Sequence, residues 1–391
     1  MSGTTRQVRP AEDAGRWEGD RGGTVHPAGT GGTGRAPAPL PVTGHRRTRV
    51  TVLFAGLALA LVAVSLASAA LGQYGIGFGD VAASVLHRAS GPLHLGHPVP
   101  DHFAEETLWQ VRMPRVVMSL LVGAGLACAG ALMQGVFGNP LADPGVIGVS
   151  SGAAIGAAVV IVTGFSAFGA FTVPAAAFCT GLAATLLVYA LSRSGGRTEV
   201  VTLVLTGIAV NAVTGAGLAF CTYFGDQTAR DQIVFWQLGS LNGSRWVYVG
   251  TVAPFVAVGT AGALWLARRL DLLALGDRAA RHVGVDVERL RLTAIVLVAV
   301  MVAAGVAFSG VIGFVGLVVP HLVRMAVGPA HRVLVPACVL GGAVLLAAAD
   351  LVARTAVRYA DLPIGMLTAA VGGPFFFWLL RRTRTRAGGW A

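Results

Sequence analysis

Three arginines with carboxylate-binding chemistry stand at the ends of long apolar runs in this sequence. Arg112 and Arg115 flank Pro114, and Arg354 follows the apolar run before the last one. The planar guanidinium group of arginine can hold a carboxylate at two points, which lysine cannot do, and Pro114 would fix the separation of the first two. Topology places all three at the outer membrane face. There they could simply extend their charges to the lipid headgroups.

The sequence lacks the residues that ATP hydrolysis by a P-loop or ion-coupled transport would need. The chain contains no lysine, which a P-loop needs at the nucleotide phosphates, so it is not a conventional P-loop ATPase by itself. An ion-coupled carrier needs carboxylates or histidines within its helices. Asp143, Asp350 and Asp361 fall at predicted span ends, and His321 is more simply a packing residue. We therefore expect no catalytic residue, and an ion-coupled secondary transporter is the alternative from a different class.

Histidines gather in one polar segment, residues 72–110, which contains His87, His94, His97 and His102. A heme or metal relay is one interpretation of this segment, although no spacing fixes a ligand set. The four cysteines all fall inside predicted spans, where they are expected to pack as small apolar residues. The sequence predicts no metal site and no bound cofactor.

The composition is typical of a multi-span membrane protein. Hydrophobic residues make up 54% of the 391 residues and charged residues only 12%, with a mean hydropathy of +0.71. The net charge of +11 comes from arginines clustered beside apolar runs, which indicates membrane topology rather than nucleic-acid binding. We predict an all-α polytopic protein in contact with membrane lipid. Its roughly ten spans are 50–71, 114–137, 146–164, 168–191, 199–222, 246–267, 290–309, 314–327, 333–351 and 364–380.

Charge at the two ends of the chain predicts its orientation. Residues 1–49 are expected to form a disordered cytoplasmic tail, 50–382 the membrane domain, and 383–391 a second cytoplasmic tail. Arginines precede the first span and follow the last one, so the positive-inside rule places both termini in the cytoplasm of a cell-membrane protein. Residues 72–110 then lie outside and 268–291 inside.

A helix break follows the second span. The run 114–137 is rich in glycine and alanine, which let membrane helices approach closely. It ends at Gly138, and Asn139, Pro140 and Leu141 follow before a second small-residue helix begins. Irregular backbone at this depth must lie at an interface or line a protein-walled cavity.

The connector 268–291 is unusually charged for this chain. Ala279, Ala280, Val283 and Val287 could form a narrow apolar stripe on a short helix that is broken at Gly284. A partner protein could bind such a segment, but a solvated connector would have the same composition.

Three ordered motifs resemble the FecCD/BtuC-like permease subunits of ABC importers for iron chelates, heme and vitamin B12. They are R-x-P-R with the following G-A-x-L-A-x-x-G-x-x-x-Q and N-P-L-A segments, SGVIGFVGLVVPHLVR at 309–324, and LPIGMLTAAVGG at 362–373. The resemblance implies a type II ABC importer permease fold without enzymatic activity. It also implies a homodimer, two ATPase subunits that bind the ATP, and an extracellular substrate-binding lipoprotein.

The resemblance also assigns roles to residues. It implies that Arg112, Arg115 and Arg354 receive glutamates of the binding protein and that Asn139, Pro140 and Leu141 belong to the cytoplasmic end of the pathway. It implies that the 268–291 connector docks on the ATPase, through Asp277, Arg278, Ala280, Arg281, Val283 and Gly284.

The cargo is the least determined feature. The segments 205–212 and 235–243 look most like those of heme-importing members, so heme is favoured. A ferric siderophore is the next candidate, and vitamin B12 is the third.

Overall fold

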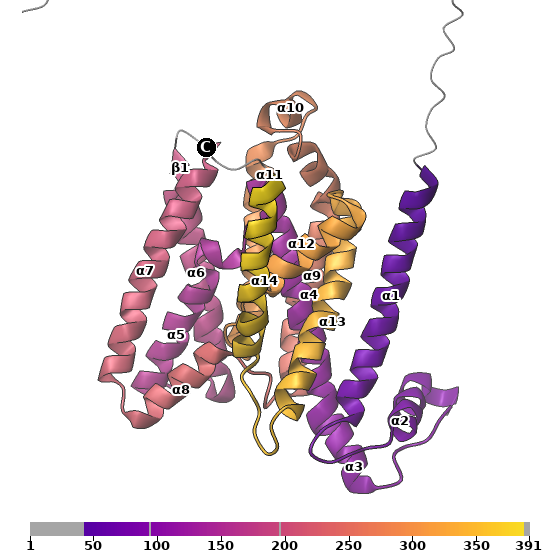
Figure 1. The fold of residues 1–391 in the computed structure, drawn as a ribbon. Coiled ribbons are helices and arrows are strands. Elements are labelled where there is room, and N and C mark those ends of the chain that lie inside the picture. Colours follow the sequence, from indigo (N-terminus) through magenta and orange to yellow (C-terminus); the bar gives the residue numbers. More distant parts are fainter. Residues whose placement is uncertain (1–42, 94, 195–196, 387–391) are drawn as a thin grey trace, which may run out of the picture. The chain divides into compact units, whose positions relative to one another are not determined.

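The computed structural model describes residues 43–93, 95–194 and 197–386, which form a helical bundle (Figure 1). Within these residues, seven helical segments are long and apolar enough to cross a membrane, and three apolar helices are shorter. Each predicted span corresponds to one helix, so the all-α membrane fold is confirmed. The ten helices are α1 (Thr43–Ala70), α4 (Met113–Phe137), α5 (Val149–Thr163), α6 (Thr172–Leu191), α7 (Val200–Phe224), α9 (Trp246–Leu273), α11 (Val287–Ser309), α12 (Val315–Val327), α13 (His331–Thr355) and α14 (Ile364–Arg386).

Short elements connect these helices. In chain order they are α2 (Phe78–Ser90), η1 (Gly91–Leu93), α3 (His102–Glu106), η2 (Thr107–Arg112), η3 (Pro144–Ile147), η4 (Gly169–Phe171), α8 (Gln227–Leu238) and α10 (Asp277–His282). The strands β1 (Arg193–Ser194) and β2 (Arg197–Thr198) pair antiparallel, with Arg193 opposite Thr198. We call the two ends of the bundle the α3 end and the α10 end; they are the lower and upper ends in Figure 1.

Both predicted tail boundaries need correction. The first helix begins at Thr43, so residues 43–49 belong to α1, and α14 continues through Arg386 beyond the predicted boundary at 382. The helix can extend past the apolar run at each end because flanking arginines such as Arg47 and Arg381 are exposed on a helical backbone. The remaining parts of the two predicted tails, 1–42 and 387–391, lie outside the described residues.

Helix α4 is the centre of the bundle. It packs against α13, α11, α9 and α12, and most of its residues are buried. A Cβ atom on Gly123 would collide with the carbonyl oxygen of Gly342 in α13, and one on Gly130 with that of Gly316 in α12. Glycine at these positions lets the backbones touch, which is how membrane helices gain packing energy without a hydrophobic drive between them.

The predicted break after α4 is present. Gly138 has a φ of 60°, the left-handed conformation that ends a helix and suits glycine. Asn139 Oδ1 then accepts a hydrogen bond from the Leu141 amide at 2.9 Å, and Asp143 caps η3 by accepting one from Gly145 at 2.7 Å. These side chains satisfy backbone groups that the broken helix leaves free.

The connector at the α10 end is shorter than predicted. Helix α9 continues through Leu273 and α11 begins at Val287, so only residues 274–286 lie between them. Within this stretch α10 is a helix of six residues, and Gly284 follows it with a φ of 84°.

Candidate functional site

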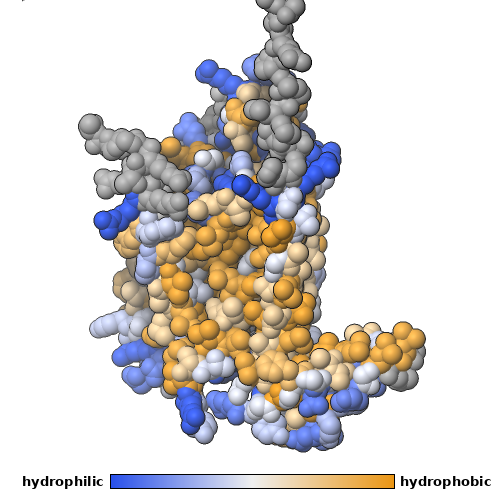
Figure 2. All heavy atoms as spheres, turned by 45° about the vertical axis from the view of Figure 1, so that its right-hand side comes forward, coloured by the Kyte–Doolittle hydropathy of each residue, from blue (hydrophilic) through white to orange (hydrophobic). Residues whose placement is uncertain are grey.

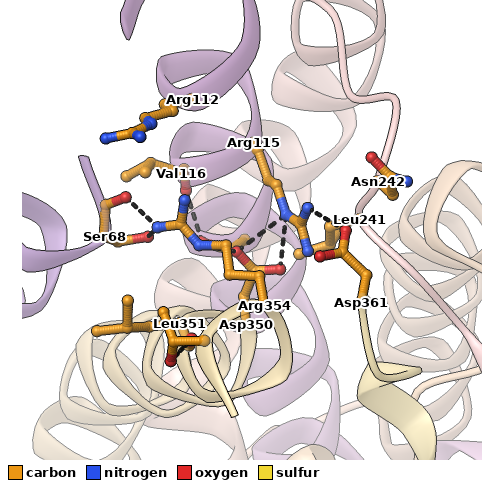
Figure 3. Close-up of polar contacts among 12 residues, drawn as sticks. Ser68, Arg112, Arg115, Val116, Leu241, Asn242, Asp350, Leu351, Arg354 and Asp361 are labelled. Atoms are coloured by element: carbon orange, nitrogen blue, oxygen red, sulfur yellow. Dashed lines mark hydrogen bonds and ion pairs between the residues drawn. The ribbon is translucent and has the colours of Figure 1, made fainter. Parts of the chain in front are cut away.

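Arg115 lies between two aspartates at the α3 end of the bundle. Its Nε donates to both carboxylate oxygens of Asp350 at 2.9 and 3.2 Å, and its Nη1 donates to Asp361 Oδ2 at 2.8 Å (Figure 3). Asp350 lies in α13 and is fully buried, whereas Asp361 lies in the loop before α14 and its side chain is 26% exposed. A carboxylate and a guanidinium that leave water together require each other as partners.

Arg354 and Arg112 are bound to the end of α1. Arg354 donates to both the carbonyl oxygen and the Oγ of Ser68, and its Nε lies 3.7 Å from Asp350 Oδ2. Arg112 donates to the carbonyl oxygens of Ala69 and Ala70, each at 2.7 Å. These are the carbonyls that the end of a helix leaves unpaired, and they carry the negative end of its dipole.

The three arginines are less exposed than the sequence indicated. They were expected to be exposed charges at a membrane rim, but their exposed fractions are only 5% for Arg112, 8% for Arg115 and 9% for Arg354. The expectation of free rim charges is therefore wrong. It failed because carboxylates and helix-end carbonyls that are distant in sequence surround these side chains in the fold.

An open cavity of about 480 Å³ nevertheless reaches all three arginines. Its lining also includes Asp361, Asn242 of the loop after α8, and Tyr74. Tyr74 donates to Asp101 at 2.6 Å, and this bond, together with one from the Phe103 amide, lowers the pKa of the Asp101 carboxyl. The cavity presents cationic groups to anything that enters from the α3 end. We call it the arginine cavity.

The sequence did not identify Asp350 and Asp361 as site residues. Asp350 was regarded as a span-end residue, yet it is buried inside α13, one helical turn before Arg354. The spacing of four residues between an aspartate and an arginine in an apolar helix was the available signal, because such residues share a helix face. For Asp361 the sequence contains no comparable signal.

The break residues lie away from the arginine cavity, at the α10 end of α4. Asn139 and Pro140 are exposed and Leu141 is half-buried. Nearby, Gln134 Nε2 donates to the Leu317 carbonyl at 3.3 Å, which joins α4 to α12. The structure thus puts the three predicted gate residues at a surface turn between α4 and η3.

The residues of α10 divide into an inner and an outer set. Ala280 is fully buried, so the prediction that it forms part of an exposed apolar stripe is wrong; Val287 is buried as well. Val283 is 60% exposed and Leu275 is 70% exposed, and these two are the large apolar side chains that the connector presents. Asp277 accepts from Arg291 at 2.9 Å and holds α10 against α11. Arg278, Arg281 and Gly284 are exposed.

The histidines of segment 72–110 do not converge. His87, His97 and His102 belong to the described residues, and no group of three or more metal-binding side chains is found among the residues that the structure covers. His94 lies outside them. The relay interpretation therefore gains no support from the geometry.

The described chain is a multi-helix membrane bundle, with buried arginines beneath a cavity at one end and a short helix at the other, and this architecture is compatible with a transport permease. The chain belongs to the FecCD transport family, whose model matches residues 57–382. It is the membrane permease of an ABC importer, in which ATP hydrolysis belongs to a separate ATPase subunit, and this sets aside the ion-coupled carrier.

Named relatives transport different cargoes. The chain is 43% identical to the hemin transport system permease protein HmuU of Yersinia pestis over 286 residues, which are 72% of this chain and 85% of HmuU. It is 42% identical to the cobalamin import system permease protein BtuC of Halobacterium salinarum over 298 residues, 76% of this chain and 79% of that one. It is 39% identical to the vitamin B12 permease BtuC of Vibrio cholerae over 281 residues, 71% of this chain and 83% of that one. These identities do not separate heme from vitamin B12.

A solved structure supports the same fold. An inward-facing metal-chelate type ABC transporter is similar with a TM-score of 0.74 and 34% sequence identity, covering 85% of this chain and 99% of that chain.

Proposed function

We propose that this permease imports heme across the cell membrane, with its α3 end outside and its α10 end, with both termini, in the cytoplasm. The observation that carries the orientation is the separation of the two candidate docking sites. The arginine cavity suits an acidic binding lipoprotein at one end, and the exposed Leu275 and Val283 suit a groove on an ATPase at the other.

Docking at the arginine cavity would be an exchange of ion pairs. Arg115 already binds Asp361, which is partly exposed, so a carboxylate of the binding protein can replace Asp361 without leaving a buried charge unpaired. Asp350 would stay in place as the fixed partner. Arg112 and Arg354 then supply positive potential that steers an acidic surface toward the cavity.

A conservative substitution tests this docking role. Arg115→Lys keeps the charge but loses the planar fork, so we expect weaker binding of the purified binding protein in detergent or nanodiscs. The control is Arg289→Ala, which removes an exposed arginine near α10. Unchanged affinity of the Arg115→Lys permease at low salt would show that the arginines only stabilise the fold.

The permease is proposed to act as a homodimer with the pathway at the interface. Helix α7 is apolar enough to span, yet few of its residues are buried. Together with α8 it lines an open hollow of about 590 Å³ that includes Thr222, Arg230 and Gln237. A second copy covering this face would enclose a polar pathway.

At the cytoplasmic end, Asn139, Pro140 and Leu141 would gate the pathway, and the α10 region would transmit the ATPase cycle. Ala280 would act here as a buried support, while Val283 makes the contact. Asp277 and Arg281, with Arg278 and Gly284, would shape the docking surface. This division of roles follows from their burial.

Heme is the proposed cargo because of two segments. Residues 205–212, which resemble heme importers, lie on the exposed α7, and residues 235–243 cover the end of α8 and the loop after it. Both would therefore border the proposed pathway. The similarity to HmuU is compatible with this cargo but does not distinguish it from vitamin B12.

Reconstitution tests the cargo directly. The permease with its ATPase and binding protein in liposomes should show ATPase activity that heme stimulates, with ferric siderophore and cobalamin as parallel arms. Stimulation by ferric siderophore or by cobalamin, with none by heme, would replace heme as the cargo while leaving the importer assignment intact.

A further inference from the structure

Helix α2 and the η1 turn carry an apolar stripe that faces away from the bundle. Its members recur at intervals of three and four residues, so they lie on one side of the helix. All of them are exposed: Phe78, Ala82, Leu86, Ala89 and Leu93. We call this set the α2 stripe. Leu93 is 73% exposed, Phe78 55% and Leu86 48%.

The opposite face of α2 fixes the direction of the stripe. Ser84 is buried, donates to Glu105 at 2.7 Å and accepts from Trp109 Nε1 at 2.9 Å. The Arg88 guanidinium lies 4.3 Å from the centre of the Trp109 ring, and Val81 is fully buried in a small core with Leu108. With three of its side chains held in this way, α2 cannot rotate to bury its stripe against the protein.

The surface around the stripe continues the apolar surface of the spans. Figure 1 shows α2 beside the α3 end of α1, projecting outward from the bundle. In Figure 2 the projecting part is hydrophobic on the side turned toward the α10 end, and this surface joins the apolar belt of the bundle; its other side is mostly hydrophilic. The neighbouring α1 exposes the large apolar side chains Leu59 and Val62.

We propose that α2 and η1 form an interfacial anchor, with the α2 stripe inserted among the acyl chains of the outer leaflet. Amphipathic helices lie in this way at the headgroup boundary, and their binding increases with the apolar area that they bury. No charged side chain belongs to the stripe: the exposed Arg88 of α2 lies over Trp109, and the exposed Asp101 and Glu106 lie on α3 and its cap. A docked protein would be expected to use polar contacts at the rim of its site, so lipid is the better match.

The anchor has a consequence for the arginine cavity. The segment that α2 holds includes Tyr74, which lines the cavity, and Trp109, whose carbonyl accepts from Trp246 at 2.8 Å. Lipid contact by the stripe therefore fixes the cavity wall relative to the membrane surface.

Lipid quenching tests the proposal on the full chain. Single cysteines replace Leu86, Leu93, Leu59 or Glu106 in a background with Cys179→Ala and Cys221→Ala, since Cys128 and Cys338 are buried. Each is labelled with bimane and reconstituted in bilayers whose lipids carry a nitroxide near the top of the acyl chain. We expect quenching at positions 86 and 93 comparable to that at position 59 on α1, and little at position 106 on α3.

Two outcomes would overturn the proposal. One is the absence of quenching at positions 86 and 93 while position 59 is quenched. The other is quenching at 86 and 93 that equals the low value at 106, combined with protection from a water-soluble quencher only after the binding protein is added. That second result would assign the α2 stripe to the protein partner.

Discussion

Arg115 illustrates how one side chain can serve both stability and recognition. Its partner Asp350 is fully buried, and its partner Asp361 is partly exposed. The buried pair cannot separate without leaving a charge in a medium that solvates it poorly. The pair with Asp361 can separate, because water can solvate the Asp361 carboxylate and either water or another carboxylate can replace it at Arg115. The two aspartates should therefore respond differently to substitution.

Removing the buried partner should destabilise the protein. In Asp350→Ala the guanidinium groups of Arg115 and Arg354 lose their shared carboxylate, and the expected loss is about 3–5 kcal/mol. Thermal unfolding of the detergent-solubilised protein, followed by tryptophan fluorescence, measures the effect. The matched control is Asp361→Asn, which should melt close to the unsubstituted protein. Equal melting of the two variants would contradict the distinction between them.

Removing the exposed partner should strengthen docking. In Asp361→Asn, the carboxylate that competes with the binding protein for Arg115 is removed. We expect the affinity for the binding protein to rise by up to about fivefold, since an exposed pair contributes roughly 0.2–1 kcal/mol. Surface plasmon resonance at two salt concentrations provides the measurement. A decrease in affinity would mean that Asp361 itself contacts the partner.

At the scale of elements, α4 is placed by its glycines. Gly123 in α4 and Gly342 in α13 approach so closely that neither tolerates a Cβ atom without a backbone shift. This contact also fixes the position of Asp350 relative to Arg115 along the helix axes, because α13 carries Asp350 and α4 carries Arg115. The glycine contact and the ion pair are therefore parts of one interface.

Enlarging Gly123 should separate these two helices. Gly123→Val is expected to cost about 1–3 kcal/mol or more, because overpacking at a rigid contact forces the backbones apart. Gly56→Val in α1 is the control, since nothing lies within 4 Å of the added Cβ there. The melting temperature of each variant in nanodiscs gives the comparison. If Gly123→Val melts at the same temperature as Gly56→Val, then α4 and α13 can adjust freely.

The α10 region should transmit the ATPase cycle through its exposed apolar residues. Leu275→Asp combined with Val283→Asp should reduce transport at least about tenfold at a near-normal rate of ATP hydrolysis, a loss of about 1.4 kcal/mol in coupling. Ala280→Asp should instead lower expression, because its side chain is fully buried. If the Leu275→Asp, Val283→Asp variant transports at the normal rate, the connector between α9 and α11 does not transmit the ATPase cycle.

At the scale of the whole molecule, the surfaces of α7 and α1 are exposed for different reasons. Both are apolar helices with little burial in a single chain. Helix α1 exposes large apolar side chains such as Leu59 and Val62, whereas α7 and α8 border an open hollow that contains Thr222, Arg230 and Gln237. Lipid in this hollow would solvate these polar side chains poorly, and a second copy would cover them instead.

Cross-linking should distinguish the two surfaces. Val213→Cys on the exposed side of α7 is expected to form a covalent dimer with a short bifunctional maleimide in native membranes, and Leu59→Cys on α1 is not. Gel electrophoresis under denaturing conditions measures the dimer. Cross-linking at position 59 but not at 213 would place the interface on the other side of the bundle.

The membrane class, the ten helices, the break at Gly138 and the family could all be predicted from the amino-acid sequence. These features depend on local runs: an apolar stretch of sufficient length must be helical in lipid, because its backbone groups have no other partners. The helix ends shifted by only a few residues at most termini, as with α5, which begins at Val149 rather than 146. The motif around Arg112 and Arg115 was likewise recognisable from spacing alone.

The contacts of these arginines could not be predicted from the sequence. Asp350 and Asp361 follow Arg115 by 235 and 246 residues, and no local pattern relates positions so far apart. The contact between Arg115 and Asp350 depends on the glycine contact between α4 and α13. The contact between Arg115 and Asp361 depends on the path of the loop before α14. The same holds for Ala280, because the side of a six-residue helix that becomes buried is set by α11 and α9 beneath it. Side-chain burial is a property of the assembled bundle, and one segment of sequence does not contain it.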